Sequence, residues 1–411
     1  MEVLQNYPVF VARQPIFTRE DQVQGYELLF RDGQMKSTAN VVDPIQATLD
    51  VICYGFDLAA STMSRPKPVY INFPQELLIQ RSALALPPKQ CVVEILETVT
   101  PEPEVIEACQ DLKDKGYTLA LDDFYGQPGY EKLIDLADIV KVDILKMHPR
   151  EIKKIVAHLS KKNITMLAEK IEHVKIYEFC KQMGFHLFQG FFFCSPKMMS
   201  GSKLNPNQSS RFLLFKELSQ DNVEMKKISE IIQEDAALSY RLLRFINSAF
   251  FGFRSKVTSI KHAVNLLGII QVSQWLTVAL LSDFSTTAPA QEASRLAAQR
   301  GKFLELLSAN HVNPPFEPHT MFMLGLFSLL DALLGRPLKE ILEELPLQDD
   351  VKSALSNPES SFTPWMKLVK SMEKGYWDEV LAGCQDLGME QEEAAIVFNT
   401  STLWTSQTLT Q

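Results

Sequence analysis

The sequence has little of several features that would assign a class directly. Its six cysteines form no Cys-X-X-Cys pair and no regular spacing, which excludes a disulfide framework or a zinc site and fits a reducing compartment. A net charge of -9 leaves no surplus of Lys and Arg to neutralise a nucleic-acid backbone. The N-terminus lacks a basic-then-apolar signal pattern, and no uncharged apolar run reaches the roughly 18–20 residues that cross a bilayer. These absences predict a cytoplasmic protein that binds neither duplex nucleic acid nor a membrane.

What the sequence does contain predicts two globular domains. Its 411 residues exceed one ordinary core, and its apolar fraction of 46% is typical of globular proteins. A polar segment, Ser200–Ser210, separates two halves of different character. Beyond it, apolar residues recur three and four positions apart, which indicates helices only. We therefore expect one domain over residues 1–203 and an all-α domain over residues 204–411.

Eight strand-like runs, rich in Val, Ile, Phe and Leu, punctuate the first domain. Amphipathic stretches such as Pro103–Lys115 and Val174–Met183 lie between most of them. Eight such alternations favour an α/β barrel of the TIM type, with a doubly wound sheet as the alternative. The runs are Val9–Phe17, Val23–Arg31, Pro68–Phe73, Cys91–Thr98, Thr118–Phe124, Ile139–Ile144, Ile164–Ile171 and Phe185–Phe193.

Polar residues lie in or at the ends of most of these runs. A strand interior gains nothing from an unpaired carboxylate, but the C-terminal ends of barrel strands converge on one open face. Taken singly, each acid fits a helix cap or a solvated strand end; spread over so many runs, they predict a site. The residues are Glu27, Asn72, Glu94, Glu97, Asp122, Asp123, Lys141, Asp143, Glu169, Glu172 and Gln189.

An oxygen-rich pocket of this kind suits hard divalent cations such as Mg²⁺, Mn²⁺ or Ca²⁺ rather than zinc. The chemistry that it supports best is two-metal hydrolysis of a phosphodiester, in which the ions acidify water and clamp the phosphoryl oxygens. A nearby lysine can orient the nucleophile or stabilise developing negative charge.

These residues resemble the ordered motifs of EAL domains. The resemblance implies a barrel that linearises cyclic-di-GMP to pGpG, uses Mg²⁺ or Mn²⁺ and is inhibited by Ca²⁺. With the early Gln14-Pro15-Ile16 it covers nearly all of residues 8–197. Its first motif is Gly25-Tyr26-Glu27-Leu28-Leu29-Phe30-Arg31, similar to EALxR, and the others are Tyr70-Ile71-Asn72, Glu94-Ile95-Leu96-Glu97, Asp122-Asp123-Phe124, Lys141-Val142-Asp143, Ala168-Glu169-Lys170-Ile171-Glu172 and Gln189-Gly190-Phe191.

The resemblance also implies a role for each residue. The two metal ions would be held by Glu27, Asn72, Glu94, Asp122, Asp123 and Glu169. The catalytic set would be Glu169 and Lys141, which activate the attacking water, Gln189, which helps to place it, and Glu97, which braces the loop after the Asp pair. Contacts to the dinucleotide would come from Gln14, Arg31, Asp143 and Glu172, with Arg31 on a phosphate and Asp143 close to the metal cluster.

The chain departs from the EAL pattern at four places. Leu28 replaces the Ala of EAL, Leu96 the Thr of ExTE, and Lys170 the Gly of AEGVE, and the loop Tyr125–Glu131 differs in length and composition. In active members that loop positions the paired aspartates and couples them to dimerisation. Two interpretations therefore stay open: a phosphodiesterase, or a degenerate barrel that serves as a cyclic-di-GMP receptor or an interaction scaffold.

The second domain resembles HDOD modules. The run Glu234–Ala249 is similar to their commonest segment, and Ser259–Val264 and Leu266–Gly268 continue it. HDOD domains are relatives of HD phosphohydrolases that lack the metal-binding His-Asp pair, and none of the seven histidines here is followed by Asp. The resemblance implies a non-catalytic regulatory domain with a protein partner that the sequence does not identify. It also implies a homodimer through the barrel, as is usual for active EAL proteins.

Overall fold

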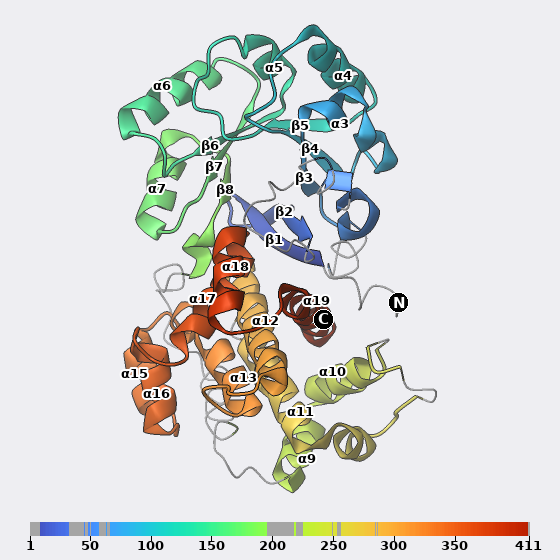
Figure 1. Cartoon of the computed structure of the whole chain (residues 1–411). Helices are drawn as coiled ribbons and strands as arrows, with labels where there is room; N and C mark the ends of the chain where they lie inside the picture. Colours follow the sequence, from blue (N-terminus) through green and yellow to red (C-terminus); the bar gives the residue numbers. More distant parts are fainter. Residues whose placement is uncertain are drawn as a thin grey trace. The chain divides into compact units, whose positions relative to one another are not determined.

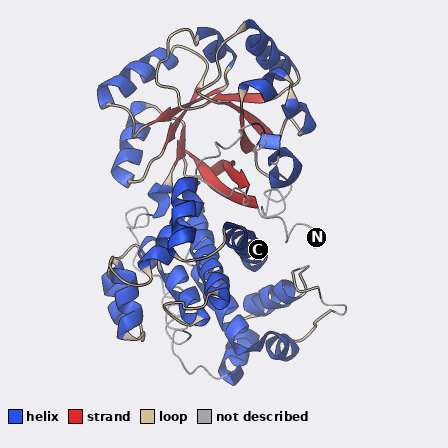
Figure 2. Ribbon diagram, viewed as in Figure 1, coloured by secondary structure: helices blue, strands red, loops and turns tan. Residues whose placement is uncertain are grey.

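The structure is a computed structural model that divides the chain into two compact units. One comprises Met1–Ser195 with Ser371–Asp378, and the other Pro196–Lys370 with Glu379–Gln411. The residues described are 9–32, 45, 48–49, 51–56, 63, 66–194, 218, 225–248, 250–252, 256–283, 285 and 287–409. The expected boundary between residues 203 and 204 falls outside these ranges and stays a prediction. Figure 2 shows strands in the first unit and helices in the second.

The first unit is a closed eight-stranded barrel with its strands in chain order (Figure 1). Each predicted run overlaps one strand, so the barrel is confirmed and the doubly wound alternative is wrong. The strands are β1 (Val9–Thr18), β2 (Val23–Asp32), β3 (Val69–Phe73), β4 (Cys91–Ile95), β5 (Thr118–Leu121), β6 (Ile139–Asp143), β7 (Thr165–Glu169) and β8 (Leu187–Gln189).

The first strand departs from a regular (β/α)8 barrel, because β1 pairs antiparallel with both β2 and β8. All other neighbouring pairs from β2 to β8 are parallel. The reason lies in the connection: residues 19–22 are too few for the crossover that parallel strands need, so they form a hairpin turn. This direction places Gln14 directly opposite Glu27.

Helices follow the strands and cover the outside of the barrel. Apolar side chains three and four apart on α4 (Val105, Ala108, Cys109 and Leu112) are buried, and Pro103 begins that helix where its missing N–H is not needed. The elements are α3 (Gln75–Ile79), α4 (Pro103–Asp114), α5 (Glu131–Leu136), α6 (Pro149–Leu159) and α7 (Val174–Met183), with shorter turns η2 (Val51–Gly55), η3 (Ser82–Ala85) and η4 (Phe191–Cys194).

Among its described residues the second unit has helices joined by turns and loops and no strand, as expected. Two of its helices approach closely through glycines: a Cβ on Gly325 would lie 2.6 Å from the backbone nitrogen of Gly301. The helices are α9 (Met225–Glu234), α10 (Ala236–Ile246), α11 (Ile260–Asp283), α12 (Ala288–Asn310), α13 (Pro318–Phe327), α14 (Leu330–Leu334), α15 (Leu338–Glu344), α16 (Asp349–Ser356), α17 (Thr363–Lys374), α18 (Trp377–Asp386) and α19 (Gln391–Leu409).

Helix α11 corrects one expectation from the sequence. By length and composition it is long and apolar enough to cross a membrane, although no such stretch was expected. Its most apolar window is 67% buried inside the protein, and Gly268, at φ 77° and ψ 166°, interrupts its helical geometry. A core helix of a globular unit has these properties as well, so α11 is weak support for a membrane span.

Candidate functional site

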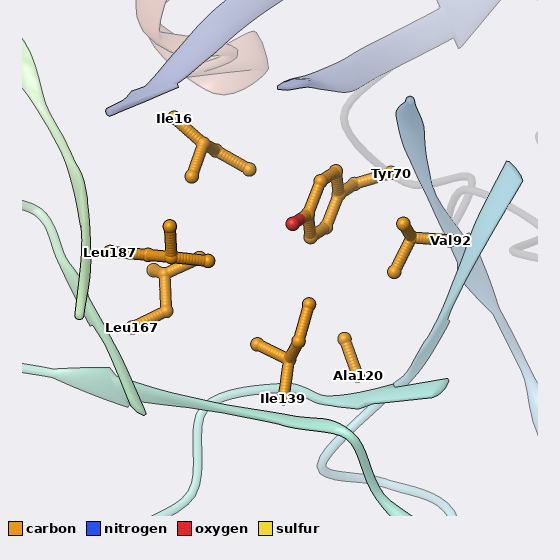
Figure 3. Packing of buried hydrophobic residues seen from close by; sticks show 7 residues of the cluster. All are labelled: Ile16, Tyr70, Val92, Ala120, Ile139, Leu167 and Leu187. Atoms are coloured by element: carbon orange, nitrogen blue, oxygen red, sulfur yellow. The ribbon is translucent and has the colours of Figure 1, made fainter. Parts of the chain in front are cut away.

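One layer of apolar side chains fills the barrel interior and fixes the level of the site. Figure 3 shows these side chains pointing toward one another. They come from every strand except β2. They are Ile16, Tyr70, Val92, Ala120, Ile139, Leu167 and Leu187. Because side chains alternate along a strand, a residue two positions further on faces the same interior. At that position, toward the carboxyl ends of β3 to β8, the sequence has Asn72, Glu94, Asp122, Lys141, Glu169 and Gln189.

Lys141 lies at the centre of this second layer, with its side chain fully buried. Four carboxylates surround its ammonium group, three from different strands and one, Asp122, from just beyond β5. The distances from Nζ are 2.6 Å to Glu94 Oε1, 2.9 Å to Asp122 Oδ1, 2.9 Å to Glu169 Oε1 and 3.4 Å to Glu27 Oε2. One ammonium cannot neutralise four ionised carboxylates, so full ionisation would leave the layer with an excess of negative charge.

The pKa values of these groups reflect burial and mutual repulsion. Burial raises the pKa of Glu169 to about 8, although Lys141 opposes the shift. Burial, together with the charge of Glu27, raises the pKa of Glu94 well above its ordinary value. Burial alone would lower the pKa of Lys141, but the surrounding carboxylates outweigh it and raise that pKa. Additional positive charge would therefore favour the ionised carboxylates.

The free oxygen atoms of this layer fit a divalent cation. Asn72 Oδ1, Glu94 Oε2 and Glu169 Oε2 are buried and have no hydrogen-bond partner, although buried polar atoms in proteins are nearly always paired. Carboxylate oxygens of Asp122, Asp123 and Glu169 lie within 4.8 Å of one another. A donor set made only of carboxylate and amide oxygens suits Mg²⁺, Mn²⁺ or Ca²⁺.

Two amides hold Glu27 in place beside Lys141. Gln189 Nε2 donates hydrogen bonds to Glu27 Oε2 and, at 2.7 Å, to Gln14 Oε1. Asn72 Nδ2 lies 3.4 Å from Glu27 Oε1. With its amide nitrogen used in this way, Gln189 keeps a buried carbonyl oxygen, Oε1, that has no partner.

Two further carboxylates, those of Asp123 and Asp143, lie at the rim of the barrel and form ion pairs with lysines. Lys170 Nζ lies 2.6 Å from Asp143 Oδ2 and 3.2 Å from Asp123 Oδ1, and Lys146 Nζ lies 2.8 Å from Asp123 Oδ2. Burial works against ionisation of Asp123, but the two lysines outweigh it and lower its pKa. Asp123 and Lys170 have positive φ angles, 41° and 57°, which non-glycine residues rarely adopt.

The remaining predicted residues are placed less centrally. Glu97 is exposed, and its link to the loop after Asp123 runs through the backbone: the hydroxyl of Tyr130 donates to the carbonyl oxygen of Glu97 at 3.2 Å. Glu172 lies beyond the end of β7 and, like Gln14, lines the cavity into which the carboxylates open. The side chain of Arg31 lies outside the described residues.

Sequence reasoning missed the two rim lysines as members of the site. In the sequence, Lys170 stands out only as a departure from the EAL motif, and Lys146 belongs to no motif. A signal for Lys146 exists, because it follows Asp143 by three residues and returns to the same rim. Nothing in the linear sequence indicates that the side chain of Lys170 turns toward Asp123 and Asp143.

Two domain families match the chain. Residues 36–196 match the EAL domain, and residues 208–330 match the HDOD domain. The EAL match begins after β2, although Gln14 and Glu27, which precede it, lie against Gln189 in the barrel.

Relatives that combine both regions are similar over almost the whole chain. The uncharacterized protein YuxH of Bacillus subtilis is 36% identical over 94% of this chain and 95% of its own length. The cyclic di-GMP phosphodiesterase CdgJ of Vibrio cholerae is 35% identical over 94% of this chain and 90% of its own. Among solved structures, the calcium and cyclic-di-GMP complex of Klebsiella pneumoniae BlrP1 is 23% identical, with a TM-score of 0.40 and coverage of 46% of this chain and 56% of that one. The chain belongs to the family of proteins that join an EAL domain to an HDOD domain.

Proposed function

We propose that this protein is a metal-dependent phosphodiesterase that linearises cyclic-di-GMP to pGpG. The observation that carries the proposal is the buried layer around Lys141, in which four carboxylates meet and Asn72 Oδ1, Glu94 Oε2 and Glu169 Oε2 have no partner. The name of its relative CdgJ, 35% identical over most of both chains, supports the choice of substrate.

The metal would be Mg²⁺ or Mn²⁺. Its ligands would come from Glu27, Asn72, Glu94, Asp122, Asp123 and Glu169, the oxygen donors of this layer and its rim. When bound, a divalent cation supplies positive charge to the phosphoryl oxygens and acidifies water.

The chain's own groups would position and deprotonate the attacking water. Glu169 Oε2 is buried and has no hydrogen-bond partner, so it is available to accept a proton from that water. The carbonyl oxygen of Gln189 is available to accept a hydrogen bond from that water. Lys141 holds the carboxylate of Glu169 at 2.9 Å and acts as a positioning residue for it.

The dinucleotide would bind along the open side of the cavity. Gln14, Glu97 and Glu172 line that cavity, and Asp143 lies beside it through its ion pair with Lys170. Together with Arg31, these groups would contact the guanine edges and the phosphates, with Glu97 stabilising the neighbouring loop. Carboxylates suit the N–H donors of guanine, and the guanidinium suits a phosphate.

Hydrolysis by the full-length protein tests the proposal. The purified chain is incubated with cyclic-di-GMP in Mg²⁺, in Mn²⁺ and without metal, and pGpG is quantified by chromatography, beside Glu27→Ala and the surface control Asp114→Ala. The phosphodiesterase proposal is supported if pGpG forms only with metal and if Glu27→Ala, but not Asp114→Ala, abolishes its formation. Tight binding without pGpG would select the receptor alternative, and no binding even with Ca²⁺ would select a scaffold.

The helical unit is proposed to regulate the barrel or to bind a protein partner. Within its described residues no three His, Cys, Asp or Glu side chains gather closely enough to hold a metal ion, which favours a role other than metal-dependent hydrolysis.

We also propose a cytoplasmic protein that dimerises through its barrel. Sedimentation equilibrium of the full chain, with and without cyclic-di-GMP, tests the dimer.

A further inference from the structure

The rim of the barrel already contains a cation of its own. Lys170 Nζ lies between two carboxylates, 2.6 Å from Asp143 Oδ2 and 3.2 Å from Asp123 Oδ1. Asp143 is only 4% exposed, and a buried carboxylate needs a charged partner or several hydrogen bonds. The backbone N–H groups of Leu145 and Lys146 donate to its Oδ1, so the ammonium of Lys170 completes the set on Oδ2.

The backbone at Lys170 is fixed by its neighbours, and the ion pairs with Asp123 and Asp143 place the ammonium. Lys170 has φ 57°, and the next residue is fixed by two hydrogen bonds, from Ile171 N to Gln189 O and from Phe192 N to Ile171 O, both 3.0 Å long. Lys146 also pairs with Asp123, but its side chain is 67% exposed against 41% for Lys170. Moving Lys146 away from the rim therefore costs little free energy. Moving Lys170 away would leave the buried carboxylate of Asp143 without its closest cation.

The charges around Lys141, Lys146 and Lys170 leave a need for additional positive charge. Six carboxylates face the ammonium groups of Lys141, Lys146 and Lys170, so full ionisation leaves an excess of three negative charges. One divalent ion reduces the excess to a single charge. A second ion near Asp123 would have to displace Lys170 or lie beside its ammonium, and both are unfavourable at these distances.

We propose that the ammonium of Lys170 takes the place of a second divalent cation, so that each chain binds a single ion. That ion belongs to the deeper donor set, where Asn72 Oδ1, Glu94 Oε2 and Glu169 Oε2 are unpartnered. Lys170 pairs with Asp143 and shares Asp123 with Lys146, so this stoichiometry leaves Asp123 outside the ligand set of the proposed function. This inference rests on the proposed metal site and specifies its stoichiometry.

Counting bound Mn²⁺ tests the proposal without relying on activity. Equilibrium dialysis with metal analysis is performed on the full-length wild type, on Lys170→Gly and on Lys170→Ala. Glycine suits the positive φ at this position, and alanine is a second variant if the first is poorly folded. Lys146→Ala is the matched control, because it removes the other lysine on Asp123. Circular dichroism verifies the fold of each protein.

The expected result is one Mn²⁺ per chain for the wild type and for Lys146→Ala, and two for the folded Lys170 variants. Two ions in the wild type, or one ion still in the Lys170 variants, would overturn the role of Lys170 while leaving a metal-dependent phosphodiesterase intact. No ion in any protein would overturn the metal site itself, and the stoichiometry with it.

Discussion

Lys141 Nζ lies 2.6 Å from Glu94 Oε1 in a place where neither side chain is exposed to solvent. An isolated pair of this kind stabilises a protein little, because desolvation offsets the attraction between the charges. Here the ammonium serves three further carboxylates, so its removal affects the whole layer. The same residue thus connects the stability of the barrel with the geometry of the candidate site.

Replacing Lys141 by methionine should destabilise the metal-free barrel strongly. The change keeps most of the side chain's length but leaves buried carboxylates without their cation, which typically costs about 3–5 kcal/mol. For a unit of this size that corresponds to a melting temperature lower by roughly 6–20 °C. Lys146→Met is the control, since Lys146 is 67% exposed and its pair with Asp123 contributes under about 1 kcal/mol. Equal melting temperatures for the two variants, followed by circular dichroism, would contradict the central role of Lys141.

Asp122→Ala should abolish hydrolysis and leave the fold intact. Asp122 lies just beyond β5, its side chain is 14% exposed, and burial raises its pKa against the opposing effect of Lys141. Its removal takes away a ligand of the proposed ion and also relieves repulsion among the carboxylates. We expect the rate of pGpG formation to fall at least about 100-fold, the effect of losing some 2.7 kcal/mol of transition-state stabilisation. The exposed Asp114→Ala is the control, and a wild-type rate in Asp122→Ala would show that the site is wrongly assigned.

Gly190→Ala should be much more destabilising than Gly184→Ala, although both glycines have positive φ. A Cβ on Gly190 would lie 2.2 Å from the carbonyl oxygen of Ile171, whereas a Cβ on Gly184 would meet nothing within 4 Å. Alanine at residue 184 therefore carries only the conformational strain of roughly 1–2 kcal/mol. At residue 190 the steric clash adds about 1–3 kcal/mol and shifts Gln189, so hydrolysis should fall too. Thermal melting of both variants checks this, and similar melting temperatures would contradict it.

Residue periodicity explains how much of this architecture could be predicted. Alternation along each strand places Glu94 two positions after Val92 and Glu169 two positions after Leu167, so a common interior layer follows from the sequence pattern. The direction of β1 could also have been inferred, because its connection to β2 is too short for a crossover. The register between distant strands cannot be predicted from the sequence. That register brings the ammonium of Lys141 within 3.4 Å of four carboxylates. The turn that places Lys170 beside Asp143 depends on the positive φ of Lys170. A lysine in the sequence does not predict that conformation, because non-glycine residues rarely adopt it.

Divalent cations should stabilise the wild-type barrel, and Glu94→Gln should remove most of that effect. Glu94 is fully buried, its Oε2 has no partner, and its pKa is raised mainly by burial, so an amide of the same shape is expected to be tolerated without metal. A ligand at 100 times its Kd adds about 2.7 kcal/mol to the stability of the folded state. Melting curves recorded with and without Mn²⁺ should therefore separate for the wild type and for the exposed control Glu104→Gln, but nearly coincide for Glu94→Gln. If the Mn²⁺-dependent rise is as large in Glu94→Gln as in the wild type, the ion is bound elsewhere, because the deepest carboxylate of the layer would then contribute nothing to its binding.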